Sequence, residues 1–132
     1  MITVIKNGTV ITMDEKRSKK HEKLDIVIKD DKILKLEANY QGEYDKLIDA
    51  TDKIIMPGLI NAHTHLGMSI FRATNDDLTL QEWLEKKIWP IEDKMTDEDV
   101  YLSALVSCLE MIKTGTTCAN DMYFGYKGTM KA

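Results

Sequence analysis

Residues 54–67 (IIMPGLINAHTHLG) constrain this chain more than any other stretch. Two apolar runs flank a break at Pro57-Gly58, and the second run leads directly into His63 and His65. A short apolar run bounded by turn residues is typical of a buried strand. Alternate side chains of a strand share a face, so both imidazoles should project to the same side. The sequence therefore predicts two adjacent histidines at the end of a strand.

This His-x-His pair is a candidate metal site, because neutral imidazole is a common zinc ligand. Small neighbours, which let the backbone approach an ion, are present at Ala62, Thr64 and Gly67. The spacing alone does not exclude a pair of hydrogen-bonded loop histidines. A catalytic zinc ordinarily takes three protein ligands and a water, and this chain offers two convincing ones. Four further residues could bind a metal, but a structural role is favoured for each of them: Cys118, Asp121, Asp76 and Asp77.

Composition narrows the class of protein. The 132 residues are 43% hydrophobic and 30% charged, which suits a globular chain with a core. A formal charge of −4 gives no attraction for phosphate backbones, so no nucleic-acid partner is expected. No apolar run reaches membrane-spanning length and no signal segment is present, so we expect no membrane partner and a cytoplasmic location. Two cysteines, Cys108 and Cys118, suit a reducing compartment and are expected to be buried.

Residues 1–56 show short β-rich runs separated by turn signals, which indicates a small all-β layer. Asn7-Gly8 is a strong two-residue hairpin signal between the first two runs. Further strands are expected at residues 24–29, 32–37, 47–48 and 54–55, the first two joined as a hairpin through Asp30-Asp31. The charged segment 14–23, which contains His21, is expected to be a solvated loop.

The remaining residues predict a strand, a loop, helices and a second strand. Residues 68–77 lack periodicity and predict a long loop. Thr79 begins a capping-box pattern, and the helix that follows should kink or end at Pro90. Thr96 caps a second helix that ends near Gly115, and residues 116–123 predict a strand. The apolar face of this second helix is predicted to consist of Tyr101, Leu105, Cys108, Leu109 and Ile112.

Residues 56–65 (MPGLINAHTH) closely resemble the first barrel strand of the metal-dependent amidohydrolase superfamily. Within it, the sequence is most similar to the branch of deaminases that act on 5'-methylthioadenosine and S-adenosylhomocysteine. The resemblance implies an α/β fold. Residues 1–56 would be the N-terminal part of a small β-sandwich, and residues 57–132 the first β/α unit of a (β/α)8 TIM-like barrel, incomplete in this chain.

The resemblance also implies the chemistry. His63 and His65 would bind one zinc, or alternatively iron, per full-length subunit. The remaining ligands and the acid and base groups would lie on strands beyond Ala132, so no catalytic group is expected within this chain. Water activated by the metal would deaminate a purine nucleoside, the small-molecule partner. The chain alone should be inactive without the rest of the barrel. The sequence does not decide whether the protein forms a homo-oligomer.

Residues 89–93 (WPIED) resemble the segment whose glutamate accepts hydrogen bonds from the ribose hydroxyls in those deaminases. Glu92 takes this role through the resemblance. Without the resemblance, Glu92 would be interpreted as a solvated carboxylate near the end of a helix. Aromatic and methionine side chains are more often packing residues, which leaves four nearby candidates outside the site: Trp83, Trp89, Met68 and Phe71.

Three other functions compete with the nucleoside deaminase. A triazine chlorohydrolase or a guanine deaminase would keep the metal site and change the substrate. A non-catalytic fragment with a role in assembly would leave the histidines without metal. A hydantoinase-like or dihydroorotase-like enzyme also uses His-x-His, with a bridging carboxylated lysine on a later strand. Asn61 stands where those enzymes usually place an aspartate, which argues mildly against it.

Overall fold

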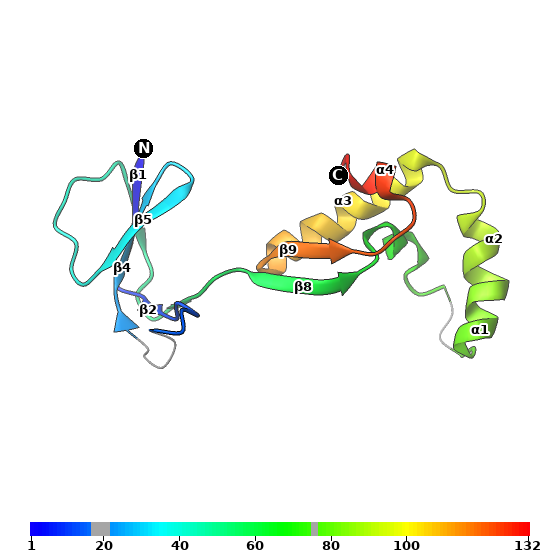
Figure 1. Cartoon of the computed structure of the whole chain (residues 1–132), viewed down its shortest axis with the longest axis horizontal. Helices are drawn as coiled ribbons and strands as arrows, with labels where there is room; N and C mark the ends of the chain where they lie inside the picture. The colour runs from blue at the N-terminus through cyan, green and yellow to red at the C-terminus, as the bar shows by residue number, and fades with distance from the viewer. Residues whose placement is uncertain (17–21, 75–76) are drawn as a thin grey trace. The chain divides into compact units, whose positions relative to one another are not determined.

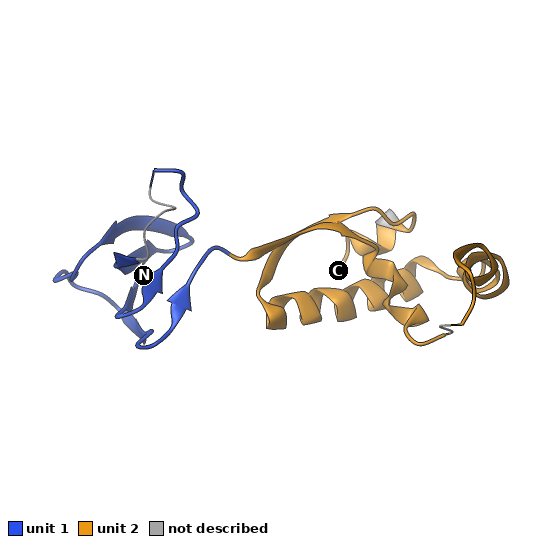
Figure 2. Ribbon diagram, turned by 90° about the horizontal axis from the view of Figure 1, so that it is seen from below, with its two compact units in different colours: residues 1–57 blue, residues 58–132 orange. Residues whose placement is uncertain are grey.

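The structure, a computed structural model, describes residues 1–16, 22–74 and 77–132. It divides into two compact units, Met1–Pro57 and Gly58–Ala132, which Figure 2 colours separately. His21 and Asp76, which the sequence singled out, lie outside the described residues. Within the described ranges, no helix has the length and apolar character needed to cross a membrane.

The unit Met1–Pro57 contains two small sheets (Figure 1). The first sheet has the order β5-β4-β1-β6, formed by β1 (Ile2–Lys6), β4 (Asp25–Lys29), β5 (Lys32–Glu37) and β6 (Lys46–Asp49). The second has the order β3-β2-β7, formed by β2 (Thr9–Val10), β3 (Glu22–Lys23) and β7 (Ile54–Ile55). Val4 and Val27 are fully buried and form the core of this unit with Tyr40. The predicted hairpin through Asp30 is confirmed, since β4 and β5 are antiparallel.

The hairpin predicted at Asn7-Gly8 is wrong, because β1 and β2 belong to different sheets. Asn7 has a left-handed φ of 67°, but the bend carries the chain from one sheet into the other. On the two sides of this bend, β1 pairs in parallel with β6 and β2 pairs in parallel with β7. The Asn7 side-chain amide donates to Asp49, at the end of β6, at 2.9 Å. A Cβ on Gly8 would overlap the Ile55 side chain. The Asn-Gly pair therefore forms a corner between sheets.

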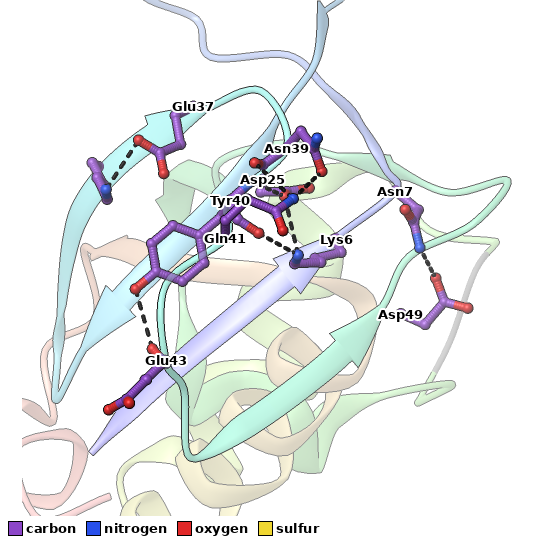
Figure 3. Close-up of polar contacts among 10 residues, drawn as sticks. Lys6, Asn7, Asp25, Glu37, Asn39, Tyr40, Gln41, Glu43 and Asp49 are labelled. Carbon is purple, nitrogen blue, oxygen red and sulfur yellow. Dashed lines mark hydrogen bonds and ion pairs between the residues drawn. The ribbon is translucent and has the colours of Figure 1, made fainter.

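A polar cluster fixes the loop after β5, and Figure 3 shows its members. The buried Asp25 carboxylate accepts the backbone N–H of Tyr40 at 2.7 Å, and the Lys6 ammonium donates to the Tyr40 carbonyl. Lys6 and Asp25 also form an ion pair at 3.8 Å. The Tyr40 hydroxyl donates to the Glu43 carbonyl at 3.1 Å. These contacts hold the Tyr40 ring in the core of the unit.

The unit Gly58–Ala132 is built on two parallel strands, β8 (Leu59–Thr64) and β9 (Thr116–Asp121). The long helix α3 (Asp97–Thr114) runs alongside them (Figures 1 and 2). The shorter elements are η1 (Leu66–Phe71), α1 (Leu80–Trp83), η2 (Leu84–Ile88), α2 (Trp89–Glu92) and α4 (Tyr126–Thr129).

The helix that begins after Thr79 is capped as predicted, since the Thr79 side chain accepts the N–H of Glu82. The sequence predicts a kink or an end at Pro90. Instead the irregularity precedes the proline, and the helix continues to Glu92. In the π-helical segment η2, the N–H of Trp89 bonds to the carbonyl of Leu84, five residues back. This wider turn accommodates Pro90, which lacks an N–H and whose ring would clash with the preceding turn of an α-helix.

The helix predicted from Thr96 to Gly115 is confirmed as α3. Thr96 and Asp99 form the reciprocal capping box, in which the Asp99 carboxylate accepts the Thr96 N–H at 2.8 Å. Hydrogen bonds from Thr96 lower the pKa of the Asp99 carboxyl, so its charged form faces the positive end of the helix dipole. Gly115 ends the helix with a φ of 85°, a left-handed conformation that costs other residues more.

The predicted apolar face of α3 is wrong in its C-terminal half, where Leu109 is 55% exposed and Ile112 is 74% exposed. The buried positions are instead Val100, Ser103 and Ala104. Small side chains allow the segment Leu66–Phe71 to pack closely on the helix, where it forms the 3-10 helix η1 rather than the predicted loop. The expected burial of the cysteines is also wrong, because Cys118 is exposed and Cys108 is only half-buried.

Replacing Asp25 with alanine tests the polar cluster. The change removes the acceptor of the Tyr40 N–H, and a buried donor without a partner costs about 1–3 kcal/mol. Asp25→Ala should therefore lower the opening free energy of β1 and β4 by about 2 kcal/mol, measured by native-state amide hydrogen exchange. The control Asp31→Ala, at an exposed turn position, should stay within about 0.5 kcal/mol of the parent. Equal effects of the two variants would contradict this role of Asp25.

Candidate metal and substrate site

His63 lies near the carboxyl end of β8, and His65 follows directly after the strand. Both side chains are exposed, and their rings meet edge to face, with centroids 5.2 Å apart and planes at 81°. The two Nε2 atoms are 3.3 Å apart. The structure thus brings the two predicted ligands together with the same ring nitrogen of each turned to one point.

This separation fits a shared metal ion. Zinc binds imidazole nitrogen at about 2.0–2.1 Å with tetrahedral angles, which places two such nitrogens about 3.3–3.4 Å apart. In the absence of metal, one ring can donate its N–H to the other, depending on the tautomer. The two residues therefore fit a metal without any change in their positions.

The neighbouring strand and its extension hold the end of β8 in place. The Asp121 carboxylate accepts the N–H of Leu66 at 2.8 Å, and the N–H of Met122 donates to the carbonyl of Thr64 at 2.9 Å. Asn120 donates its side-chain amide to the carbonyl of Ala62 at 3.2 Å. Because these bonds bracket both histidines, they fix the backbone from which the imidazoles project.

Helix α3 fixes the other side of the turn after the histidines. The Ser107 hydroxyl donates to the Leu66 carbonyl at 2.9 Å, and the Ser69 hydroxyl donates to the Ser103 carbonyl at 2.7 Å. Arg72 and Glu110 form a two-pronged ion pair, with N–O distances of 2.7 and 2.8 Å. The Arg72 guanidinium lowers the pKa of the Glu110 carboxyl, which stabilises the charged pair. The segment after His65 is therefore held along its length.

The other candidate ligands do not join the histidines. Among the residues that the structure describes, no group of three or more histidine, cysteine, aspartate or glutamate side chains is arranged to bind a metal ion. Asp121 has a structural contact with Leu66, and Cys118 lies on β9 opposite Ile60. Asp76 lies outside the described residues.

A hollow of about 330 Å³ lies beside His65. Met68, Phe71 and Trp83, which sequence reasoning treated as packing residues, line it together with His65, Arg72 and two serines. The ring of Trp89, in contrast, is 43% exposed and does not line this hollow. Apolar and aromatic walls next to a polar group are typical of small-molecule sites.

Glu92, the predicted substrate contact, is joined to the histidine pair through Tyr123. The Tyr123 hydroxyl donates to Glu92 Oε1 at 2.6 Å. The Tyr123 ring also meets the His65 ring edge to face, with centroids 6.4 Å apart. Burial, followed by the hydrogen bond to Glu92, raises the pKa of the Tyr123 hydroxyl well above its usual range, so it stays protonated. Tyr123 therefore contacts two of the three predicted site residues, Glu92 and His65, and His65 in turn contacts His63.

Sequence reasoning missed Tyr123. It lies two residues after the last residue of β9, and therefore near the edge of the sheet where the histidines emerge. Parallel strands present their carboxyl ends at the same edge, and this rule was the available signal. The contact with Glu92 has no sequence signature, since the two residues are 31 positions apart.

Comparison with known proteins identifies the family. The sequence model of the amidohydrolase family matches residues 54–132, which is more than half of the chain. The chain belongs to the amidohydrolase family. Members of this family are metal-dependent, in agreement with the fit of the two histidines to a metal ion.

Several relatives of this amidohydrolase chain are named deaminases. The chain is 48% identical over 129 residues to a 5'-deoxyadenosine deaminase of Methanosarcina mazei, covering 98% of this chain and 30% of the relative. It is 47% identical over 133 residues to a 5-methylthioadenosine/S-adenosylhomocysteine deaminase of Thermoanaerobacter pseudethanolicus, covering 100% of this chain and 31% of the relative. The chain thus spans about 30% of the length of these curated relatives.

A solved structure with bound zinc is also similar. It is an adenosine deaminase from Xanthomonas campestris, with a TM-score of 0.88 and 30% sequence identity. The similarity covers 96% of this chain and 30% of that one. The fold of this amidohydrolase chain therefore matches part of a zinc-containing enzyme.

Zinc titration tests the histidine pair directly. This chain should bind zinc through His63 and His65, measured by isothermal titration calorimetry. His63→Ala should weaken the binding by more than about tenfold, because one imidazole cannot chelate. The control His21→Ala changes the third histidine of the chain and should bind as the parent does. Equal losses in the two variants would show that zinc binds elsewhere.

Proposed function

We propose that this chain is the N-terminal part of a metal-dependent hydrolase that removes the 6-amino group of an adenine nucleoside. The substrates that fit best are 5'-modified adenosines such as S-adenosylhomocysteine or 5'-methylthioadenosine. The observation that carries the proposal is the 3.3 Å separation of the two Nε2 atoms, in a chain 48% identical to a named adenosine-type deaminase. This separation is the one expected for two imidazole nitrogens on the same tetrahedral ion.

In this proposal Gly58–Ala132 is the first β/α unit of a (β/α)8 barrel, and residues 1–57 are part of a β-sandwich. Parallel pairing of β8 with β9 across an intervening helix supports the assignment. Active sites of such barrels lie at the carboxyl ends of the strands, which is where His63 and His65 stand. Later strands of the full-length protein would supply the remaining ligands.

The histidines would hold one zinc or iron ion per full-length subunit. When bound, the ion would make an activated water available near neutral pH. Neutral imidazoles leave the charge of the ion uncompensated, which favours this activation. The bonds at the end of β8 fix the backbone that carries both rings, and the two Nε2 atoms already lie 3.3 Å apart, so little rearrangement is needed on binding. The chain alone brings two such ligands together and should have no turnover.

Glu92 would select nucleosides over free bases. Its carboxylate lies on the last turn of α2 and is only partly exposed. A carboxylate offers about four acceptor positions, and the Tyr123 hydroxyl occupies one of them. The remaining positions suit the two neighbouring hydroxyls of a ribose. Sites built to bind substrate hydroxyls reject analogues that lack them, because the polar group is then left unpaired.

Ammonia release by the full-length protein tests the proposal. The wild type should deaminate 5'-deoxyadenosine or S-adenosylhomocysteine. Glu92→Gln should raise KM for the nucleoside by about 10–100-fold, since a hydrogen bond to a charged group contributes about 1.5–3 kcal/mol. The control Asp93→Asn changes an exposed carboxylate one residue further along the chain and should leave KM unchanged. No ammonia release from a zinc-loaded wild type would overturn the proposed function.

A further inference from the structure

Tyr123 contacts both parts of the candidate site. Its hydroxyl donates to Glu92 Oε1 at 2.6 Å, the length of a hydrogen bond from a hydroxyl to a charged carboxylate. Its ring lies edge to face against His65, with ring planes at 70°. One side chain therefore spans from a candidate metal ligand to the candidate substrate carboxylate.

The position of the Tyr123 ring is itself tightly determined. The tyrosine is 8% exposed. A Cβ on Gly67 would lie 2.6 Å from the Tyr123 ring carbons and 3.0 Å from Val100, so the missing side chain of Gly67 makes room for the ring. The N–H of Met122 bonds to the Thr64 carbonyl and fixes the backbone just before the tyrosine. The ring is thus packed against η1, and β8 fixes the backbone that precedes it.

Glu92, in contrast, stands on a helical segment with few polar ties to the rest of its unit. Across residues 58–74 and 77–132, the Tyr123–Glu92 bond is the one hydrogen bond that joins the helix 80–92 to the two strands and the residues directly after them, to η1 or to α3. The other side-chain bonds of this helix stay local, between Thr79 and Glu82, Gln81 and Glu85, or Lys86 and Glu82. The placement of the Glu92 carboxylate therefore depends on Tyr123.

We propose that Tyr123 is a positioning residue that sets the Glu92 carboxylate at a fixed place relative to the histidine pair, and through it sets selectivity for substrates with a complete ribose. This inference rests on the proposed function. The tyrosine does not contact the substrate: it occupies one acceptor position of Glu92 and restricts the carboxylate to one orientation. A carboxylate held before binding loses less conformational freedom when two substrate hydroxyls bond to it.

Selectivity between two nucleosides in the full-length, zinc-loaded protein tests the inference. The probes are 5'-deoxyadenosine and 2',5'-dideoxyadenosine, which differ only in the 2'-hydroxyl. Tyr123→Phe keeps the ring and removes the hydroxyl. It should raise KM for 5'-deoxyadenosine by about tenfold, the equivalent of one hydrogen bond, with kcat nearly unchanged. It should leave 2',5'-dideoxyadenosine much less affected, so the ratio of the two kcat/KM values falls.

Tyr40→Phe is the matched control. Tyr40 is also 8% exposed and also donates its hydroxyl within the protein, but it lies in the unit Met1–Pro57. Its variant should keep the parent selectivity. In a Glu92→Gln background, Tyr123→Phe should add little further loss, because the tyrosine acts through the glutamate. Gly67→Ala, which displaces the ring and retains the hydroxyl, should reduce selectivity in the same direction, with zinc content measured alongside.

The outcomes separate this inference from the proposed function. If the wild type deaminates 5'-deoxyadenosine and Glu92→Gln impairs it, while Tyr123→Phe has the same selectivity as Tyr40→Phe, the positioning role is overturned and the proposed function stands. Equal losses for both nucleosides in Tyr123→Phe would indicate a merely structural role and also overturn the inference. A zinc-loaded wild type that releases no ammonia from either nucleoside removes both proposals.

Discussion

Two hydrogen bonds at the end of β8 determine where the histidine pair stands. The Asp121 carboxylate accepts the Leu66 N–H, and the Thr64 carbonyl accepts the Met122 N–H. Both bonds cross from β8 or its extension to β9 or its extension, so they depend on the parallel pairing of the two strands. They hold the backbone on both sides of His65, from which the two imidazoles converge with their Nε2 atoms 3.3 Å apart.

Further contacts fix the residues that surround the two strands. Serine hydroxyls tie η1 to α3, and close packing there requires small residues on the helix. Gly67 leaves space for the Tyr123 ring, which in turn reaches Glu92 on the helix 80–92. A polar group that is held in place before binding discriminates better than one that must be ordered by the ligand. The contacts thus run from the pairing of β8 and β9 to His63 and His65, and from His65 through Tyr123 to Glu92.

Local signals in the sequence predicted local structure well. The capping box at Thr96 and the left-handed Gly115 are each decided by a few neighbouring residues, and both lie where the pattern placed them. The same holds for the turn at Asp30. The common side of His63 and His65 also follows from the alternation of side chains along a strand. The family resemblance rested on the same residues and is confirmed by the match to the amidohydrolase family.

Features that depend on distant partners were not predictable in this way. Asn7-Gly8 indicates a bend, but the two residues do not determine which strands pair on either side of it. In the structure β1 pairs with β6 and β2 pairs with β7, so no hairpin forms. The exposed Leu109 and Ile112 show that helical periodicity does not reveal which face a neighbour covers. The bond between Tyr123 and Glu92 joins residues on separate elements and leaves no periodic trace. The contact between Tyr123 and Glu92 is therefore visible only in three dimensions.

The central claim is that His63 and His65 bind one metal ion through their Nε2 atoms. Anomalous diffraction at the zinc absorption edge, from crystals of the full-length protein grown with zinc, measures this directly. We expect one strong peak about 2.0–2.1 Å from both Nε2 atoms. A peak bound to neither histidine, or two rings turned away from each other around an ion held by other residues, would contradict it.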